Sequence, residues 1–244
     1  MDEATPTDLA PLREPPAAPQ VATHNFRFSE DYDLYPSGAK TKYKNNVMAI
    51  KLLKQIELEK RTATPEEQII LARYVGWGGL ANAFSSTASG WENEYQELKS
   101  LLTDVEYKAA MNSTITAYYT EPDLIRHIYR ALERFGFEGG PDRKILDPGM
   151  GTGNFYSVLP EQFQGSKLFG VELDSITGRI AKQLYPDADI SIMGYEATKF
   201  EDNSFDVILG NIPFNSVKIY DRRYNDLNPY IHDYFFIKSL DLSL

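Results

Sequence analysis

The feature that most constrains this chain is the alternation of short apolar runs with helix-like stretches in its second half. The runs are KILDPGMG (144–151), KLFGVELD (167–174), ADISIMG (188–194) and FDVILGN (205–211). Helical spacing near 153–162 and 175–185 separates the first three. Alternating strands and helices predict an α/β fold with an open parallel sheet. Ligands of such sheets bind outside the carboxyl ends of the strands.

The first half of the chain has a different pattern. Residues 1–22 contain five prolines and predict a disordered tail. Helices are expected over 46–60, from a Thr64-Pro65-Glu66-Glu67 start with capping-box spacing, and over 91–102. We therefore expect a small helical region at 23–112 and an α/β domain at 113–244.

Composition excludes several kinds of protein. The chain has no cysteine, so disulfides and thiolate chemistry are excluded, and its three scattered histidines make a metal site improbable. No apolar run reaches the ~18 residues of a membrane span, which predicts a cytoplasmic protein. A net charge of -10 argues against sequence-independent binding of nucleic acid. Seven basic residues against two acidic ones at 40–61 form either a local nucleic-acid patch or a solvated helix face.

A glycine loop, DPGMGTGNF (Asp147 to Phe155), follows the first expected strand. Gly149, Gly151 and Gly153 let the backbone turn sharply and let a ligand approach closely. Their spacing is not that of a dinucleotide or phosphate loop. Asp147 would repel a pyrophosphate and attract a cationic ligand, so the loop predicts a site for a ligand with an amino group and a sulfonium. The alternative is a plain glycine-rich turn.

Acids follow the next two expected strands. Glu172 lies 25 positions after Asp147, close to the offset at which an acid meets the ribose hydroxyls of a nucleoside. Asp174 competes for this role, but its position favours a helix N-cap. Glu196 could touch the base of the nucleoside or could be an ordinary exposed acid.

The fourth run ends in an unusual turn, Gly210-Asn211-Ile212-Pro213-Phe214. The side-chain oxygen of Asn211 and the backbone carbonyl after it could accept hydrogen bonds from an exocyclic amino group. Pro213 would hold the turn rigid, and Phe214 would offer a ring on which a planar base can stack. Two such acceptors would direct the nitrogen lone pair toward a methyl donor, with the base taken out of its duplex.

A further motif, AYYTEP, ends at Pro122 and opens another helix. Asp123 and Pro122 suit the first turn after Thr120, and the helix is expected to bury Leu124, Ile128 and Leu132. The tyrosines before the cap are either core residues or part of a pocket.

In this order the motifs resemble the gamma-class amino-methyltransferases that act on adenine N6 in DNA. The resemblance covers about 117–240 and implies a class I, Rossmann-like fold that uses S-adenosyl-L-methionine. It assigns cofactor binding and base binding to two sets of residues. By this resemblance the cofactor set is Tyr119, Thr120, Asp147, Gly149, Gly151, Gly153 and Glu172, and the base set is Asn211, Pro213 and Phe214. From their positions in the same motifs and strand ends we add Pro148, Asn154, Phe155 and Glu196 to the expected cofactor set and Ile212 to the expected catalytic turn. Ile212 replaces the first proline of the family's catalytic motif.

The stretch TPEEQIILARYVGWGGLANAF, with GMGTGNF and GNIPF, resembles the methylase-like region of large polyvalent proteins of phages and conjugative elements. Such proteins often carry a helicase region. The resemblance implies DNA as partner, and it implies that the sheet is truncated after its fourth strand and needs a carboxyl-terminal half. Methylation of RNA bases or of a protein glutamine, and a non-catalytic scaffold on DNA, remain alternatives.

Overall fold

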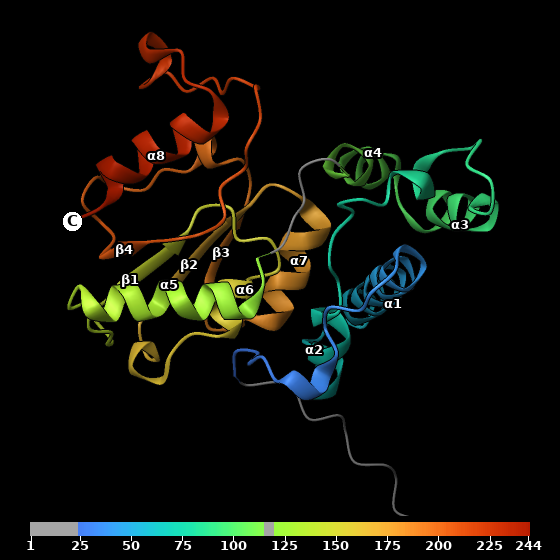
Figure 1. The fold of residues 1–244 in the computed structure, drawn as a ribbon, viewed down its shortest axis with the longest axis horizontal. Coiled ribbons are helices and arrows are strands. Elements are labelled where there is room, and N and C mark those ends of the chain that lie inside the picture. Colours follow the sequence, from blue (N-terminus) through green and yellow to red (C-terminus); the bar gives the residue numbers. More distant parts are fainter. Residues whose placement is uncertain (1–23, 115–119) are drawn as a thin grey trace, which may run out of the picture.

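The computed structural model describes residues 24–114 and 120–244 (Figure 1). The expected tail at 1–22 lies outside this range. The helices are α1 (Ala39–Leu58), α2 (Pro65–Ala72), α3 (Glu92–Leu101), α4 (Asp104–Ser113), α5 (Pro122–Arg134), α6 (Asn154–Ser157), α7 (Ser175–Leu184) and α8 (Ile231–Leu242). The strands are β1 (Lys144–Asp147), β2 (Lys167–Glu172), β3 (Asp189–Ile192) and β4 (Val207–Ile208).

All four strands pair in parallel, in the order β3-β2-β1-β4. The chain runs outward from β1 through β2 to β3 and then returns to place β4 on the other side of β1. This reversal creates a switch point between β1 and β4, where open α/β sheets bind ligands. A parallel bridge between Phe205 and Ser243 lies beside the start of β4. The order and the parallel strands confirm the expected α/β, Rossmann-like fold of class I type.

Neighbouring residues of β1 enter different cores. Ile145 belongs to a large cluster with residues of α5, α6 and α7, whereas Leu146 belongs to a second cluster with residues of α8. Side chains on a strand alternate between faces, so the two clusters cover opposite faces of the sheet. Figure 1 shows α5 and α8 on opposite sides of the strands.

The helical region packs on the sheet domain through α7. The Nε2 atom of Gln68 in α2 donates to the carbonyl of Gln183 at 2.9 Å. Arg179 of α7 pairs with Glu57 of α1 at 3.0 Å and also with Glu106 of α4. The larger core runs continuously through both parts.

Several expected boundaries are correct and others are wrong. The Thr64–Glu67 capping box is confirmed. The first helix starts at Ala39 instead of 46, and α4 was not expected, although Thr103 and Glu106 also form a capping box. The helix expected at 153–162 is only α6, because Pro160 lacks an N–H and disfavours helical backbone just before it.

The expected buried face of α5 needs correction. Leu124 is 57% exposed, whereas Ile125 and Tyr129 are buried. Ile128 and Leu132 are partly buried and pack against the core, as expected. The N-cap is Glu121 instead of Thr120, and the stripe facing the sheet contains Ile125 and Tyr129 in place of Leu124.

Candidate functional site

Asp147 ends β1 and lies buried at the switch point, with 1% of its surface exposed. Its Oδ1 accepts a hydrogen bond from the N–H of Gly149 at 3.1 Å. A Cβ added to Gly210, which follows β4, would lie 2.3 Å from the same oxygen. The carboxyl group is therefore enclosed between the ends of β1 and β4, and only glycine at 210 leaves it room.

Glu172 ends β2 and fastens the glycine loop to that strand. Its Oε2 accepts from the N–H of Gly151 at 2.9 Å, and its Oε1 accepts from the N–H of Asp174 at 2.7 Å. Asp174 itself caps α7, because its Oδ2 accepts from the N–H of Thr177 at 2.9 Å. The preference for Asp174 as an N-cap is thus confirmed.

Both carboxyl groups are weakened as acids by their surroundings. Burial raises the pKa of Asp147 to about 8, with the N–H of Gly149 opposing the rise and the charge of Glu172 adding to it. Burial also raises the pKa of Glu172 to about 7, opposed by hydrogen bonds from the N–H groups of Asp174 and Gly151. A cation bound beside these carboxyl groups would favour their charged form and lower both pKa values.

The glycine loop depends on two close approaches. Gly153 has φ +87°, and a Cβ there would lie 2.3 Å from the buried ring of Tyr185. A Cβ on Gly170 in β2 would lie 2.1 Å from the sulfur of Met150, which is buried within the loop. Side chains at either position would push the loop away from the sheet.

The residues that follow the loop bring the start of α5 beside it. The Nδ2 of Asn154 donates to the carbonyl of Thr120 at 3.3 Å. The carbonyl of Phe155 accepts from the hydroxyl of Tyr129 in α5 at 2.9 Å. Pro148 and Phe155 are buried. Thr120 therefore lies beside the glycine loop, and its role in cofactor binding stays a prediction, while Tyr119 lies outside the described residues.

The Asn211–Phe214 turn lies directly beside the glycine loop. A Cβ added to Gly149 would lie 3.7 Å from the backbone oxygen of Asn211 and 3.8 Å from Cδ of Pro213. Ile212 is half-buried and packs against the core under α8. An isoleucine anchored in this core holds the turn where the resembling family has a proline, so the substitution does not leave the turn unsupported.

Phe214 and Glu196 both point outward. Phe214 is 76% exposed, and its ring lies parallel to that of His232, with centroids 4.4 Å apart. Glu196 is exposed on the turn after β3. Burial lowers the pKa of Lys238 in α8, and the negative charges of Asp221 and Glu196 oppose this effect.

Some residues near the site were not expected from the sequence. Phe26, Leu34 and Tyr35, which precede α1, line a small cavity together with Thr152 and Asn154 of the glycine loop. The segment is held by a 2.7 Å bond from the N–H of Phe26 to the carbonyl of Leu184. Its aromatic residues show no strand or helix period, so no sequence pattern revealed this contact.

The basic stretch at 40–61 is largely paired with glutamates. Lys40 lies 2.7 Å from Glu94 and Lys51 lies 2.7 Å from Glu97. Lys54 pairs with Glu106 and Arg61 with Glu67 in the same way. These contacts favour the reading of this stretch as an internally paired helix face.

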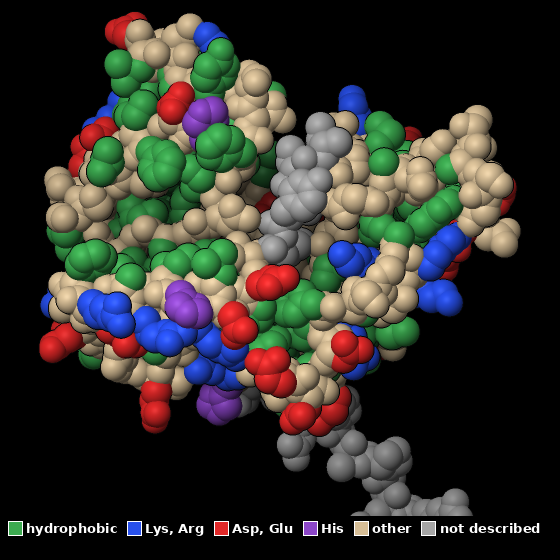
Figure 2. All heavy atoms as spheres, in the orientation of Figure 1, with side chains coloured by type: hydrophobic (Ala, Val, Ile, Leu, Met, Phe, Trp, Pro, Cys, Tyr) green, Lys and Arg blue, Asp and Glu red, His purple; other side chains and the backbone are tan. Residues whose placement is uncertain are grey.

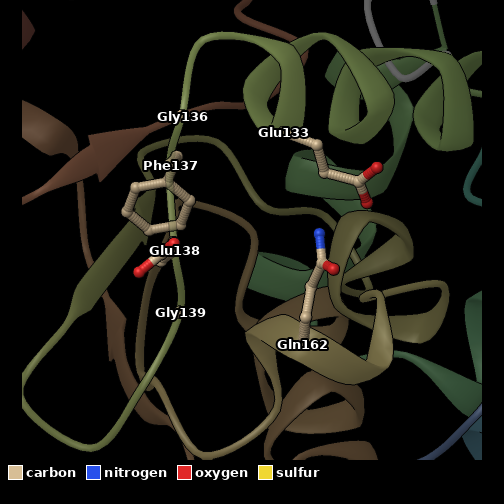
Figure 3. A pocket seen from close by; sticks show the side chains of 6 residues that line it. All are labelled: Glu133, Gly136, Phe137, Glu138, Gly139 and Gln162. Carbon is tan, nitrogen blue, oxygen red and sulfur yellow. The ribbon is translucent and has the colours of Figure 1, made fainter.

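A separate cavity of about 480 Å³ lies away from these motifs. It is lined by Glu133, Gly136, Phe137, Glu138, Gly139 and Gln162 (Figure 3). These residues precede β1 and β2, so the cavity lies toward the amino ends of the strands, opposite Asp147 and Glu172.

No helix within the described residues is long and apolar enough to cross a membrane.

One protein-family model matches part of this chain. A model of the family described as "Methyltransferase domain" matches residues 146–223, which contain the ends of β1, β2, β3 and β4. These findings support a methyltransferase domain in this chain. The match to this family, on a sheet of this topology, also supports S-adenosyl-L-methionine as the cofactor of the domain.

Two curated relatives match stretches of different length in this chain. Defense against restriction protein B of Escherichia phage P1 is 27% identical over 203 residues, which is 80% of this chain and 7% of that protein. Modification methylase CviBIII of Paramecium bursaria Chlorella virus NC1A is 32% identical over 78 residues, which is 32% of this chain and 21% of that protein. The chain thus spans a small part of the length of both relatives.

Solved structures resemble the chain only in part. A putative sarcosine dimethylglycine methyltransferase from Galdieria sulphuraria matches with 16% identity and a TM-score of 0.35, covering 40% of this chain and 38% of that one. A likeness of this extent assigns no substrate.

The residues at the carboxyl ends of β1 and β2 fit the cofactor. Its methionine moiety carries a sulfonium and an ammonium group, whose charge matches the carboxyl group of Asp147, and its ribose hydroxyls could donate hydrogen bonds to the carboxyl group of Glu172. The enclosed carboxyl of Asp147 lies against a loop whose glycines leave no side chains in the way of a ligand.

Proposed function

We propose that this chain is the methyl-transferring part of a DNA methyltransferase that acts on the N6 amino group of adenine. The observation that carries the proposal is the contact between two loops. The Asn211–Phe214 turn lies against Gly149, at the switch point where Asp147 is enclosed. A methyl acceptor held by the first loop would thus be next to a cofactor held by the second.

The cofactor supplies an electrophilic methyl group when bound. Asp147 and Glu172 would hold its cationic and ribose ends, and Thr120, Pro148, Gly149, Gly151, Gly153, Asn154 and Phe155 would shape the pocket. Tyr119 is assigned to the same pocket from the sequence, and Glu196 is assigned to the far end of the nucleoside. These assignments rest on position in the fold and on the family resemblance.

The turn after β4 would prepare the acceptor nitrogen. The amide oxygen of Asn211 and the carbonyl of Ile212 would accept both hydrogens of the adenine amino group. This localises the nitrogen lone pair, which conjugation with the ring otherwise withdraws. Pro213 fixes the turn, and Phe214 presents an exposed ring on which the base can stack. The methyl group would pass directly to nitrogen as its bond to sulfur breaks, and the nitrogen would release one of its hydrogens as a proton to solvent. The chain has no cysteine for a covalent intermediate.

The names of the relatives support a role connected with modification and restriction. One is a modification methylase and the other a defence-against-restriction protein of a phage. Such a role favours DNA over an RNA base or a protein amide as the acceptor. A carboxyl-terminal half or a helicase region would belong to a longer protein of this kind.

The test separates binding from turnover. Adenine-containing DNA, RNA and a glutamine peptide are incubated with cofactor, and mass spectrometry identifies the methylated product. We expect N6-methyladenine in DNA, and we expect Asn211→Ala to reduce kcat by at least ~100-fold while cofactor affinity stays within about threefold. Asn215→Ala, in the same segment, is the matched control. Methyl transfer to another acceptor, or full activity of Asn211→Ala, would contradict the proposal.

A further inference from the structure

Three rings form a parallel column beside the Asn211–Phe214 turn. The ring of Phe214 stacks on His232 with centroids 4.4 Å apart and 5° between the planes. The ring of His232 then stacks on Tyr230 at 5.9 Å and 13°. The Nζ of Lys218 lies 5.5 Å from the centroid of the Tyr230 ring. We call Phe214, His232 and Tyr230 the aromatic column.

The backbone holds this column in place. Lys218 and Tyr230 form an antiparallel bridge, and the N–H of Ile231 donates to the carbonyl of Val217 at 2.8 Å. The two segments that carry the rings are therefore fastened to each other. These bonds hold the three rings together at the amino end of α8.

The column is open at its Phe214 end. Phe214 is 76% exposed, Tyr230 is 45% exposed, and the His232 side chain between them is only 24% exposed. Hydrophobic side chains gather on the surface around α8 in Figure 2. A large ring that is both exposed and fixed loses little freedom when another planar group stacks on it.

His232 also carries a nitrogen that the packing does not use. Its Nδ1 is buried and has no hydrogen-bond partner among the described residues. Its Nε2 lies 3.6 Å from the carboxylate of Asp233. Stacking on Phe214 uses the face of the His232 ring and not this nitrogen, so a phenyl ring at the same position could brace Phe214 equally well.

We propose that His232 is a positioning residue that braces Phe214, and that the aromatic column selects an unpaired base in a single strand. This inference rests on the proposed function and specifies its substrate. A base in a duplex must first be unstacked and unpaired before it can cover the free face of Phe214, whereas a base in a single strand covers it at a smaller cost in free energy. Lys218 beside Tyr230 provides a positive charge for the phosphates of that strand.

The experiment uses the full chain without cofactor and a short DNA strand with a central 2-aminopurine. Fluorescence anisotropy gives the affinity, and quenching of 2-aminopurine reports stacking. The column predicts that the single strand binds at least fivefold more tightly than its duplex and is quenched on binding. His232→Leu should weaken binding about tenfold and remove the quenching, whereas His232→Phe should lose less than threefold.

Phe236→Leu is the control, because Phe236 is 60% exposed on α8 and lies outside the column. Equal affinities for single strand and duplex, or equal effects of His232→Leu and Phe236→Leu, would overturn the inference. The assay needs no methyl transfer, so its result is independent of the proposed reaction. Quenching through the column without methylation of adenine would reject the reaction alone, and methylation unaffected by His232→Leu would reject the column alone.

Discussion

A cluster of ion pairs joins the helical region to the sheet domain, and its centre is Glu106. The Glu106 side chain is 10% exposed and contacts Lys54 of α1 at 2.9 Å and Arg179 of α7. It also accepts from the N–H of Thr103 at 2.9 Å, which caps α4. Burial raises the pKa of Glu106, but the bonds from Lys54, Thr103 and Arg179 outweigh this effect and lower it to about 2.

The substitution Glu106→Gln removes the charge and keeps the shape. The shift in the pKa of Glu106 from 4.5 to about 2 means that the folded protein favours the charged carboxylate over the protonated form by ~3 kcal/mol more than the unfolded chain does. Lys54 and Arg179 are partly exposed and water can solvate them in the variant. We therefore expect a loss of about 2 kcal/mol in unfolding free energy, or roughly 4–8 °C in Tm for a chain of this size.

Urea denaturation at pH 7 and at pH 3 measures this effect. Because the pKa of Glu106 is lower in the folded protein, its contribution is present above pH ~4.5 and is lost as the pH falls toward 2. The difference in unfolding free energy between the parent and Glu106→Gln should therefore be smaller at pH 3 than at pH 7. Glu97→Gln is the control, since Glu97 is 38% exposed and pairs with Lys51, and it should cost less than ~1 kcal/mol. Equal losses for the two variants, or a gap that grows at pH 3, would refute this account of the contact.

Two further predictions concern the glycine loop and its acids. Gly153→Ala and Gly165→Ala place a Cβ at the same φ of +87°, but only the first meets Tyr185, while nothing lies within 4 Å of the second. In urea denaturation, we expect Gly153→Ala to lower the unfolding free energy by at least ~2 kcal/mol more than Gly165→Ala does. Gly153→Ala should also weaken cofactor binding at least tenfold. Equal losses of unfolding free energy for the two variants would contradict the close approach of Gly153 to Tyr185. Because burial raises the pKa of Asp147 to about 8, the cofactor-free protein should lose stability as the pH rises from about 4 to 8. Thermal unfolding across this range should show a flatter dependence for Asp147→Asn, and a parent that gains stability over this range would contradict the shift.

The sheet was predictable because the sequence carries two signals for each strand, an apolar run and the residue that ends it. Apolar runs such as Val207-Ile208-Leu209 show a buried strand, and the Gly, Asp or Asn after each run shows where the strand ends. Parallel strands place these ends at one edge, so Asp147, Glu172 and Asn211 could be assigned to one site without knowledge of side-chain positions.

Contacts between residues distant in sequence could not be predicted in this way. His232 braces Phe214 from 18 positions away, and no period links them. Leu124 was placed on the buried face of α5 although it is exposed, because a shift of one residue rotates a helical stripe by about 100°. The Glu106 cluster depends on the docking of α1, α4 and α7, which only the tertiary structure determines.

Titration calorimetry with S-adenosyl-L-methionine tests the central claim most directly. At pH 7, pKa values of about 8 and 7 leave Asp147 mostly protonated and Glu172 about half protonated. If Asp147 binds the cationic end of the ligand and Glu172 its ribose, both as carboxylates, binding should release about one and a half protons. This release is measured as a difference in binding heat between buffers with different ionisation enthalpies. Asp147→Asn should bind at least tenfold more weakly and release about half a proton, while Asp189→Asn, at the exposed start of β3, should match the parent. Binding without proton release, or no binding by a chain shown to be folded, would contradict the assignment of Asp147 and Glu172 to the cofactor pocket.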